Sequence, residues 1–586
     1  MEQEMVKARI GERREDEREE WVHDSSLDYR GRIPIRASTG AWKASLFIIA
    51  IEFSERLSYF GIATNLISYL TKVLHQEIKI AAKNANYWIG VTTVMPLLGG
   101  FFADAYIGRF PMILLSSVFY LMGLGLMSMS QFIPSLKPCN TKICPSPRRI
   151  HEVVFFLAMY LISVGTGGHK PCLESFGADQ FDDDHGKERM QKMSFFNWWN
   201  FALCCGLLLG VTLVVYVQDY ASWGVAILIL SVTMAVALMV FYIGRVFYRY
   251  RLPEGSPLTP MLQVCVAAIR KRKLAHPSTP ALLYEVSKSQ GRLLNHTSKL
   301  SFLDKAAIVE GSTPVKQPSR WRLATVTGVE ETKLIINMIP IWLTSLTFGV
   351  SVAQSSTFFV KQSSTMNRKI GDNFEIPAAS IHALSAISML ISVTIYDKIL
   401  VPILRRATGS ARGLQILQRI GIGMVFSVLT MVIAAVVERK RLGVAKKETV
   451  QGGRAGTLHM SAFWLGPQYL TLGIGDAFTL VGLQEYFYDQ VPDSMRSLGM
   501  AFYLSTIGVG SFLSSFLITI VDHITKKSGA SWFGKDVNKS RLDNFYWFLA
   551  VLNTINLCVY VILARRYTYK SVQRTEVITD ETEPTA

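Results

Sequence analysis

Nine apolar stretches of 18 or more residues contain no Lys, Arg, Asp or Glu, and they dominate the sequence. A helix needs about 20 mostly apolar residues to cross the hydrocarbon core of a bilayer, so each stretch is long enough to span a membrane. Three further apolar stretches have similar lengths but include ionisable residues. The sequence therefore predicts an all-α membrane protein with twelve transmembrane helices. The uncharged stretches are 84–103, 110–136, 193–218, 220–244, 334–360, 376–396, 420–437, 497–521 and 544–564, and the interrupted ones are 43–72, 153–176 and 461–488.

The composition agrees with a lipid-facing exterior. Half of the 586 residues are hydrophobic and only 18% are charged, which is too apolar for the surface of a soluble protein of this length. The formal charge of +17 could indicate nucleic-acid binding, but the basic residues interrupt apolar runs and form no stripe on a polar domain. Lys and Arg at the ends of membrane helices are typical of cytoplasmic loops. We therefore expect a lipid bilayer as the surroundings and no nucleic-acid partner.

The predicted helices fall into two groups of six. The stretch between them holds thirteen Lys and Arg against four acidic residues from Arg249 to Arg322, which predicts a cytoplasmic linker. The basic loops 132–150 and 438–460 fit this orientation less well, because it places them on the opposite face. Two six-helix bundles around a central site are typical of the major-facilitator fold. The predicted parts are a cytoplasmic tail (1–40), an N-terminal bundle (41–246), the linker (247–330), a C-terminal bundle (331–565) and a second cytoplasmic tail (566–586).

The first predicted span carries Glu52, Glu55 and Arg56 at helical spacing, so the three side chains share one helix face. Glu52 follows Lys43 by nine residues, or about 13 Å along a helix, which places it near mid-membrane. An ionisable group at that depth costs at least about 2.5 kcal/mol and usually has a functional reason. Two acids beside one base leave an excess carboxylate, so we expect this cluster to bind and release a proton. The alternative is an ion network that only joins helices.

Two further spans carry charges that could meet. Lys170 and Glu485 lie in opposite halves at similar predicted depths, which makes them candidate salt-bridge partners. A bridge between the halves could form when the pathway closes on one side and break when it opens. The alternative is that each side chain faces a water-filled cavity separately. Asp476 and Glu174 rank below these two because each lies nearer a polar boundary or a predicted helix break. His169, beside Lys170, could titrate near neutral pH, but we expect a satisfied, pore-facing histidine with no mechanistic role.

Several motifs together resemble the plant nitrate- and peptide-transporter family, within the proton-dependent oligopeptide transporter group. The resemblance covers the whole chain apart from the tails and the linker, and the motifs occur in the same order. They are EFSER at 52–56, GGFFADAYIGRF at 99–110, GTGGHKPCLESFGADQF at 165–181, SFFNWWN at 194–200 and GLQEYFYDQVP at 482–492.

The resemblance implies functional roles for several residues. It assigns proton coupling to Glu52, Glu55 and Arg56, and substrate sensing with salt bridging to Lys170 and Glu485. It implies a cytoplasmic hinge between the second and third spans, formed by Asp104, Gly108 and Arg109. The chain also departs from the family at several positions, which weakens histidine-mediated nitrate binding, peptide transport and a phosphorylation switch. Val352 bears on nitrate binding, Cys204 and Phe60 on peptide transport, and Ala105 on the phosphorylation switch. His169 stands where an apolar residue is common in the family, which could alter the pKa of Lys170.

These observations predict a proton-coupled secondary transporter of a small polar or anionic solute, such as nitrate, a peptide or a plant hormone or metabolite. The solute is expected between the halves, near the charged residues and Gln354. The alternative is an uncoupled facilitator or channel-like anion carrier of the same fold.

No nucleophile motif or metal-ligand cluster indicates an enzyme, and the proton is the coupling ion in place of a cofactor. We also expect a plasma or vacuolar membrane location and a regulatory kinase acting on cytoplasmic loops. Asn538 begins a glycosylation sequence, Asn538-Lys539-Ser540.

Overall fold

The computed structural model describes most of the chain. The residues outside the description are 1–20, 23–25, 137–148, 183–184, 254, 257, 275–282, 285–295, 310–318, 320, 372–373, 409–413, 451–456, 492–495, 528–530, 535 and 570–586.

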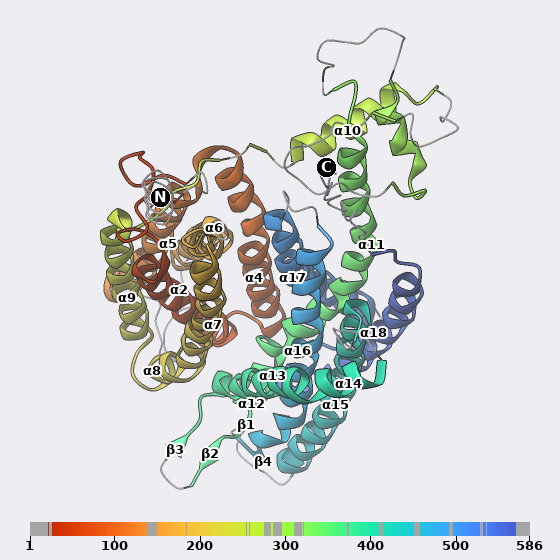
Figure 1. Ribbon diagram of the computed structural model, residues 1–586. Coiled ribbons are helices and arrows are strands. Elements are labelled where there is room, and N and C mark those ends of the chain that lie inside the picture. The colour runs from red at the N-terminus through yellow and green to blue at the C-terminus, as the bar shows by residue number, and fades with distance from the viewer. Residues whose placement is uncertain are drawn as a thin grey trace, which may run out of the picture.

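Helices make up both halves of the molecule, as the sequence predicted (Figure 1). The N-half consists of α2 (Ala41–Ala63), α3 (Leu66–Lys72), α4 (Ile78–Phe102), the π-helix η1 (Ala103–Ile107), α5 (Arg109–Phe132), α6 (Arg149–Ala178), α7 (Gly186–Leu209), η2 (Gly210–Val214), α8 (Val215–Tyr220), α9 (Trp223–Ile243) and η3 (Gly244–Val246). The C-half consists of α11 (Val326–Ser355), α12 (Phe358–Ser364), η6 (Ala378–His382), α13 (Ala383–Ile395), η7 (Tyr396–Leu400), α14 (Val401–Thr408), α15 (Ile416–Val450), η8 (Ala462–Leu465), α16 (Gly466–Asp489), α17 (Arg496–Lys527), η10 (Val537–Lys539) and α18 (Leu542–Arg565).

Short elements fill the connections. The segment between the halves contains α10 (Leu258–Arg270) and η5 (Ser301–Ala307). Two small sheets lie at the opposite end of the C-half. They pair β1 (Met366–Asn367) with β4 (Leu458–Ser461) and β2 (Lys369–Ile370) with β3 (Phe374–Glu375). We call the end of the molecule at α10 the linker side and the end at these strands the far side (Figure 1).

Ten of the described helical segments are long and apolar enough to cross a membrane. The segments α2 and α16 are of comparable length but are not among the ten. They carry the Glu52 cluster and Asp476, so the charges that make these helices less apolar are the ones the sequence marked as unusual. The mainly helical membrane fold is confirmed, and twelve spans result when α2 and α16 are included.

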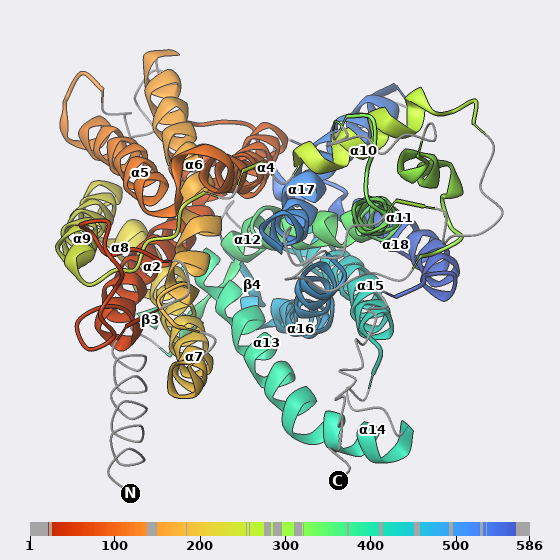
Figure 2. The same cartoon turned by 45° about the horizontal axis from the view of Figure 1, so that its top comes forward.

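The two halves lie side by side and contact each other toward the far side (Figures 1 and 2). Among the described residues, the polar contacts between the halves lie in the middle or at the far-side ends of their helices. No such contact joins the linker-side ends of the described helices. The contacts are Thr71–Lys361 at 2.6 Å, Lys79–Asp522 at 3.2 Å, Lys83–Ser515 at 3.2 Å, Asn86–Ser514 at 3.2 Å, Val211–Ser380 at 2.7 Å and Tyr220–Glu375 at 2.8 Å.

Each half also has its own packing at the linker side. The segment before α2 lies against the N-half, where Arg36 contacts Glu188 at 2.9 Å and the buried Arg249 contacts the same carboxylate at 2.7 Å. The linker packs on the beginning of α11, where Lys333 contacts Asp304 at 2.7 Å. These contacts stay within one half, so they stabilise each half without joining the two.

Candidate functional site

The charged cluster of α2 forms as its helical spacing predicted. The Arg56 guanidinium donates from Nε to Glu52 Oε1 at 2.6 Å, and the same nitrogen lies 3.1 Å from Glu55 Oε2. Both carboxylates are almost completely buried. Glu52 Oε2 and both oxygens of Glu55 have no hydrogen-bond partner among the described residues. One guanidinium therefore serves two buried carboxylates and leaves most of their oxygens unsatisfied.

Lys170 lies on α6, where glycine and proline shape the helix. Pro171 lies inside α6 and cannot donate a backbone hydrogen bond to the preceding turn. Gly99 of α4 lies directly against the Gly167 carbonyl, so a Cβ atom at position 99 would collide with the α6 backbone. This close approach brings α4 and α6 together one turn before Lys170.

The Lys170 ammonium lies 4.0 Å from the centre of the Tyr59 ring, a cation–π contact to the same helix that carries the Glu52 cluster. No carboxylate lies within ion-pair distance of Lys170 among the described residues. Lys170 is therefore a buried cation whose charge is compensated only at longer range. His169, expected to be satisfied and to face a pore, is fully buried, and neither of its ring nitrogens has a hydrogen-bond partner among the described residues.

The predicted Lys170–Glu485 salt bridge is not formed in this conformation. Glu485 lies 3.4 Å from Arg419 of the same half, and 38% of its side-chain surface is exposed. It lies four residues before the end of α16, or about 6 Å along the axis, whereas Lys170 lies about 12 Å from the end of α6. The two residues therefore differ in depth by about one helical turn, and Glu485 lies nearer the linker-side rim.

Asp476 is the more deeply placed acid of α16, although the sequence ranked it below Glu485. It is 9% exposed, and its Oδ1 atom has no hydrogen-bond partner among the described residues. Tyr503 of α17 interacts electrostatically with Asp476, and it also interacts with Glu174 and Arg56 of the N-half. Tyr503 is thus close enough to charged groups of both halves for them to act on its hydroxyl.

Gln354 lies within the contact between the halves. Its Nε2 atom donates to Ser514 Oγ at 3.1 Å, and the same hydroxyl accepts from Asn86 of α4 at 3.2 Å. Gln354 is fully buried, and its Oε1 atom has no partner among the described residues. The residue therefore belongs to the closed contact in this conformation, with one oxygen available for a further interaction.

The predicted hinge residues lie together at the linker side of the N-half. Gly108 adopts φ +87°, which only glycine adopts readily, and this conformation allows the sharp break between η1 and α5. Arg109 contacts Asp104 at 3.2 Å and also pairs with Asp179 at the end of α6. Residues 104–109 are thus fastened to α6, the helix that carries Lys170.

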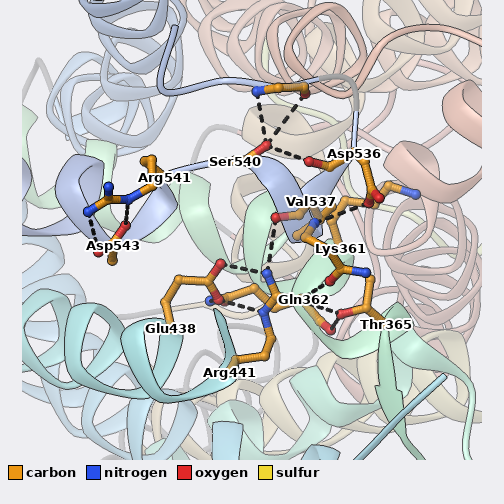
Figure 3. Close-up of polar contacts among 12 residues, drawn as sticks. Lys361, Gln362, Thr365, Glu438, Arg441, Asp536, Val537, Ser540, Arg541 and Asp543 are labelled. Atoms are coloured by element: carbon orange, nitrogen blue, oxygen red, sulfur yellow. Dashed lines mark hydrogen bonds and ion pairs between the residues drawn. The ribbon is translucent and has the colours of Figure 1, made fainter. Parts of the chain in front are cut away.

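The sequence underestimated the polar core of the C-half. The stretch 420–437 ended where Glu438 begins, but α15 continues to Val450 and buries Glu438 and Arg441 completely. Their carboxylate and guanidinium contact each other at 2.7 Å (Figure 3). Arg441 also donates to Asn538 Oδ1 at 2.6 Å, so the predicted glycosylation site has its side chain engaged within the fold. Three-residue spacing between Glu438 and Arg441 was the signal that could have indicated this pair.

Two bundles of long apolar helices with incompletely paired charges in their interior are typical of secondary transporters of the major-facilitator type. Solved structures share this fold. The in meso crystal structure of the POT family transporter PepTSo matches with a TM-score of 0.66 and 20% identity, over 89% of this chain and 98% of that one. The crystal structure of an auto-inhibited POT family peptide transporter matches with a TM-score of 0.66 and 21% identity, over 92% of this chain and 99% of that one.

The sequence comparisons identify the family. The PTR2 model of the POT family matches residues 110–536. Protein NRT1/PTR FAMILY 5.6 of Arabidopsis thaliana is 60% identical over 579 residues, which cover 98% of this chain and 99% of that protein. Protein NRT1/PTR FAMILY 5.7 of the same plant is 60% identical over 566 residues, with coverages of 95% and 93%. The chain belongs to the POT family and is a multi-pass membrane transporter of the NRT1/PTR group, not an enzyme.

Proposed function

We propose that this protein is a proton-coupled symporter of a small polar or anionic solute and works by alternating access. The observation that carries the proposal is the charge balance of the N-half site. Glu52, Glu55 and Glu174 supply three carboxylates, whereas Arg56 and Lys170 supply only two cations. Buried carboxylates without compensating charge favour proton binding. Asp476, the buried acid of the C-half, adds a further carboxylate.

In this proposal the linker faces the cytoplasm, so contact at the far side corresponds to an inward-open state. A proton on Glu52 frees Arg56 from one of its two carboxylates, and Glu55 remains as its partner. Lys170 then contacts the solute or an acid of the C-half. We assign the acid role to Asp476 in preference to Glu485 because Asp476 is buried and lacks a hydrogen bond on one oxygen. Release of solute and proton would return Arg56 to both carboxylates.

The energetics fit an anionic solute carried with more than one proton. One proton moving down 100 mV gains about 2.3 kcal/mol, roughly a fifty-fold concentration ratio. A monovalent anion needs two protons before the membrane voltage contributes to its uptake. The several carboxylates of the site could hold two protons.

Nitrate, a peptide and a plant hormone or metabolite are the solute classes to test. The plasma and vacuolar membranes are the locations to examine with a fluorescent fusion.

The test is uptake into proteoliposomes with an imposed pH gradient, using nitrate, a dipeptide and an organic-acid hormone as separate probes. Glu52→Gln removes the proton site but keeps the shape of the side chain. We expect it to abolish acid-driven accumulation while exchange of the same solute across the membrane continues. Glu77→Gln, at an exposed carboxylate before α4, is the matched control and should behave like the unchanged protein. Undiminished accumulation by Glu52→Gln would instead support the uncoupled facilitator.

A further inference from the structure

The linker helix α10 is apolar around almost its whole circumference. It extends over Leu258–Arg270 and contains no charged residue before Arg270. One face, formed by Val264, Ala267 and Ala268, is buried in a cluster with residues of η5 and the beginning of α11. A surface helix normally has a single apolar face, whereas a helix that is apolar all round is typical of positions that are covered on both sides.

The opposite face of α10 is exposed. Four residues at spacings of four, three and four form a stripe along this face, which we call the outer stripe: Leu258, Leu262, Cys265 and Ile269. Leu262 is 58% exposed and Ile269 is 65% exposed. Neighbouring large aliphatic side chains are unfavourable in water, and such exposed patches mark sites of contact with a protein or a membrane. The outer stripe therefore points to a partner.

The charges next to the outer stripe indicate what kind of partner it fits. The acidic residues of the linker that the structure describes are Asp304 and Glu330, and both are buried against Lys333 at 2.7 and 2.8 Å. Three basic residues at the end of α10 and just beyond it are exposed, and we call them the basic border: Arg270, Arg272 and Lys273. An apolar stripe beside exposed cations complements an anionic phospholipid surface.

The position of α10 along α11 corresponds to the headgroup region of a bilayer. Val329 of α11 belongs to the same buried cluster as Val264 of α10, and it lies five residues before the uncharged stretch that begins at 334. Five residues extend over about 7.5 Å of helix, and each headgroup region of a bilayer is about 5–8 Å thick. In Figure 1, α10 runs across the linker-side end of α11, as a helix that lies along a membrane surface would.

We propose that α10 is an interfacial helix whose outer stripe and basic border bind anionic phospholipid. The aliphatic side chains of the outer stripe enter the boundary between headgroups and acyl chains, and the basic border contacts the phosphate groups. In the orientation of the proposed function this is the cytoplasmic leaflet, which carries a negative surface potential. The lipid contact itself requires neither transport nor a proton gradient, so it goes beyond the proposed function.

The bound lipid would anchor the C-half at the linker side. Lys305 of η5 donates to the Arg272 carbonyl at 2.7 Å, which joins η5 to the end of α10. The adjacent Asp304 lies 2.7 Å from Lys333 of α11. These contacts connect α10 through η5 to the first helix of the C-half, so a lipid contact at α10 is transmitted to that half.

The test uses the full chain in nanodiscs of phosphatidylcholine alone or of phosphatidylcholine mixed with phosphatidylglycerol. A bimane label on Leu262→Cys reports lipid contact through its quenching by brominated acyl chains, after subtraction of the signal from the protein without Leu262→Cys. We expect several-fold stronger quenching in the anionic mixture, because each cation near an anionic surface increases binding about fivefold. Lys369→Cys, at an exposed position of β2 on the far side, is the control label and should give equal quenching in both mixtures.

Neutralising the basic border separates charge from apolar contact. The triple variant Arg270→Gln/Arg272→Gln/Lys273→Gln keeps the outer stripe, so quenching in the anionic mixture should fall to the value in phosphatidylcholine. Lys369→Gln is the control substitution and should leave the quenching of the position-262 label unchanged. All three positions of the basic border are exposed, so we expect the variant to fold, which size-exclusion chromatography checks.

The outcomes are independent of whether the protein is a proton symporter. Equal quenching of the Leu262→Cys label in the two lipid mixtures would overturn the proposal, and so would quenching that the triple variant leaves unchanged. Concentration-dependent dimers that shield the label without quenching would also overturn it, because a second copy of the chain would then cover the outer stripe.

Discussion

The two halves of this transporter bury charge in opposite ways. The N-half holds Glu52, Glu55 and Arg56 near the middle of α2, with three of the four carboxylate oxygens lacking a hydrogen bond to described residues. The C-half holds Glu438 and Arg441 near the far side, and both are completely buried. The carboxylates of the N-half cluster lack hydrogen-bond partners on most of their oxygens, whereas both oxygens of Glu438 in the C-half are hydrogen-bonded.

The Glu438 and Arg441 side chains of the C-half make hydrogen bonds to each other and to neighbouring side chains (Figure 3). Arg441 donates to both oxygens of Glu438 at 2.7 Å, and to Thr365 Oγ1 at 3.0 Å. Gln362 donates to the same carboxylate at 2.6 Å. A bidentate pair with this many hydrogen bonds has no remaining capacity to exchange partners. The comparison indicates that the C-half pair fixes helices, whereas the N-half cluster can rearrange when a proton or solute binds.

Removing one member of the satisfied pair should have the largest effect on stability. Arg441→Met leaves the Glu438 carboxylate buried without its cation, which should cost about 3–5 kcal/mol of unfolding free energy. Thermal unfolding in detergent, followed by fluorescence-detected size exclusion, measures the loss. Arg439→Met, at an exposed position of the same helix, is the control. The double variant Glu438→Leu/Arg441→Met should recover much of the loss, and equal stability of Arg441→Met and Arg439→Met would refute a structural role for the pair.

A second prediction compares two acids of the same helix. Asp476→Asn should reduce proton-driven uptake by about tenfold or more, because it removes the deeply buried carboxylate of the C-half. Glu485→Gln should change uptake by less than about twofold, since Glu485 is partly exposed and pairs with Arg419. Initial rates in proteoliposomes, normalised to the amount of folded protein, provide the measurement. The reverse order of effects would restore Glu485 as the acid that works with Lys170.

The sequence predicted the Glu52 cluster well because all its members lie on one helix. Spacing along a single helix fixes which side chains meet, so the contacts of Arg56 followed from residue numbers alone. The partner of Lys170 lies on another helix, and spacing does not specify how two helices face each other. Asp476 and Glu485 are nine residues apart, about 180° around a helix, so they lie on opposite faces. Only the packing of α16 shows which face is buried.

The sequence also did not predict where the helices end. Lys170 and Glu485 were predicted at similar depths, but α16 ends at Asp489, only four residues after Glu485. Counting uncharged residues shortened α15, because a charged residue was taken as the end of the span. A buried ion pair breaks that rule when its partners are on the same helix. The positions of the spans could thus be predicted, but the satisfied charges of the C-half could not.

The smallest predicted effect concerns the contact that joins the two halves at the far side. Thr71 accepts a hydrogen bond from the buried Lys361 ammonium at 2.6 Å and donates to the Ile67 carbonyl at 2.8 Å. Thr71→Val removes the bond between the halves, which should favour far-side opening by about 0.5–1.5 kcal/mol, or about two- to tenfold in population. Thr394→Val is the matched control, since the Thr394 hydroxyl donates only within its own helix at 2.8 Å.

The measurement uses a cysteine that the closed far side covers. Ser68→Cys lies on α3 at a fully buried position, one turn from Thr71, so a membrane-impermeant maleimide should reach it only when the halves separate there. Thr71→Val should increase the labelling rate about two- to tenfold over the Ser68→Cys background, and Thr394→Val should leave it unchanged.

The protein without Ser68→Cys gives the contribution of the native cysteines. Equal labelling with Thr71→Val would mean that the Lys361–Thr71 contact does not hold the far side closed, and that the remaining contacts of Lys79, Asn86 and Ser380 are sufficient.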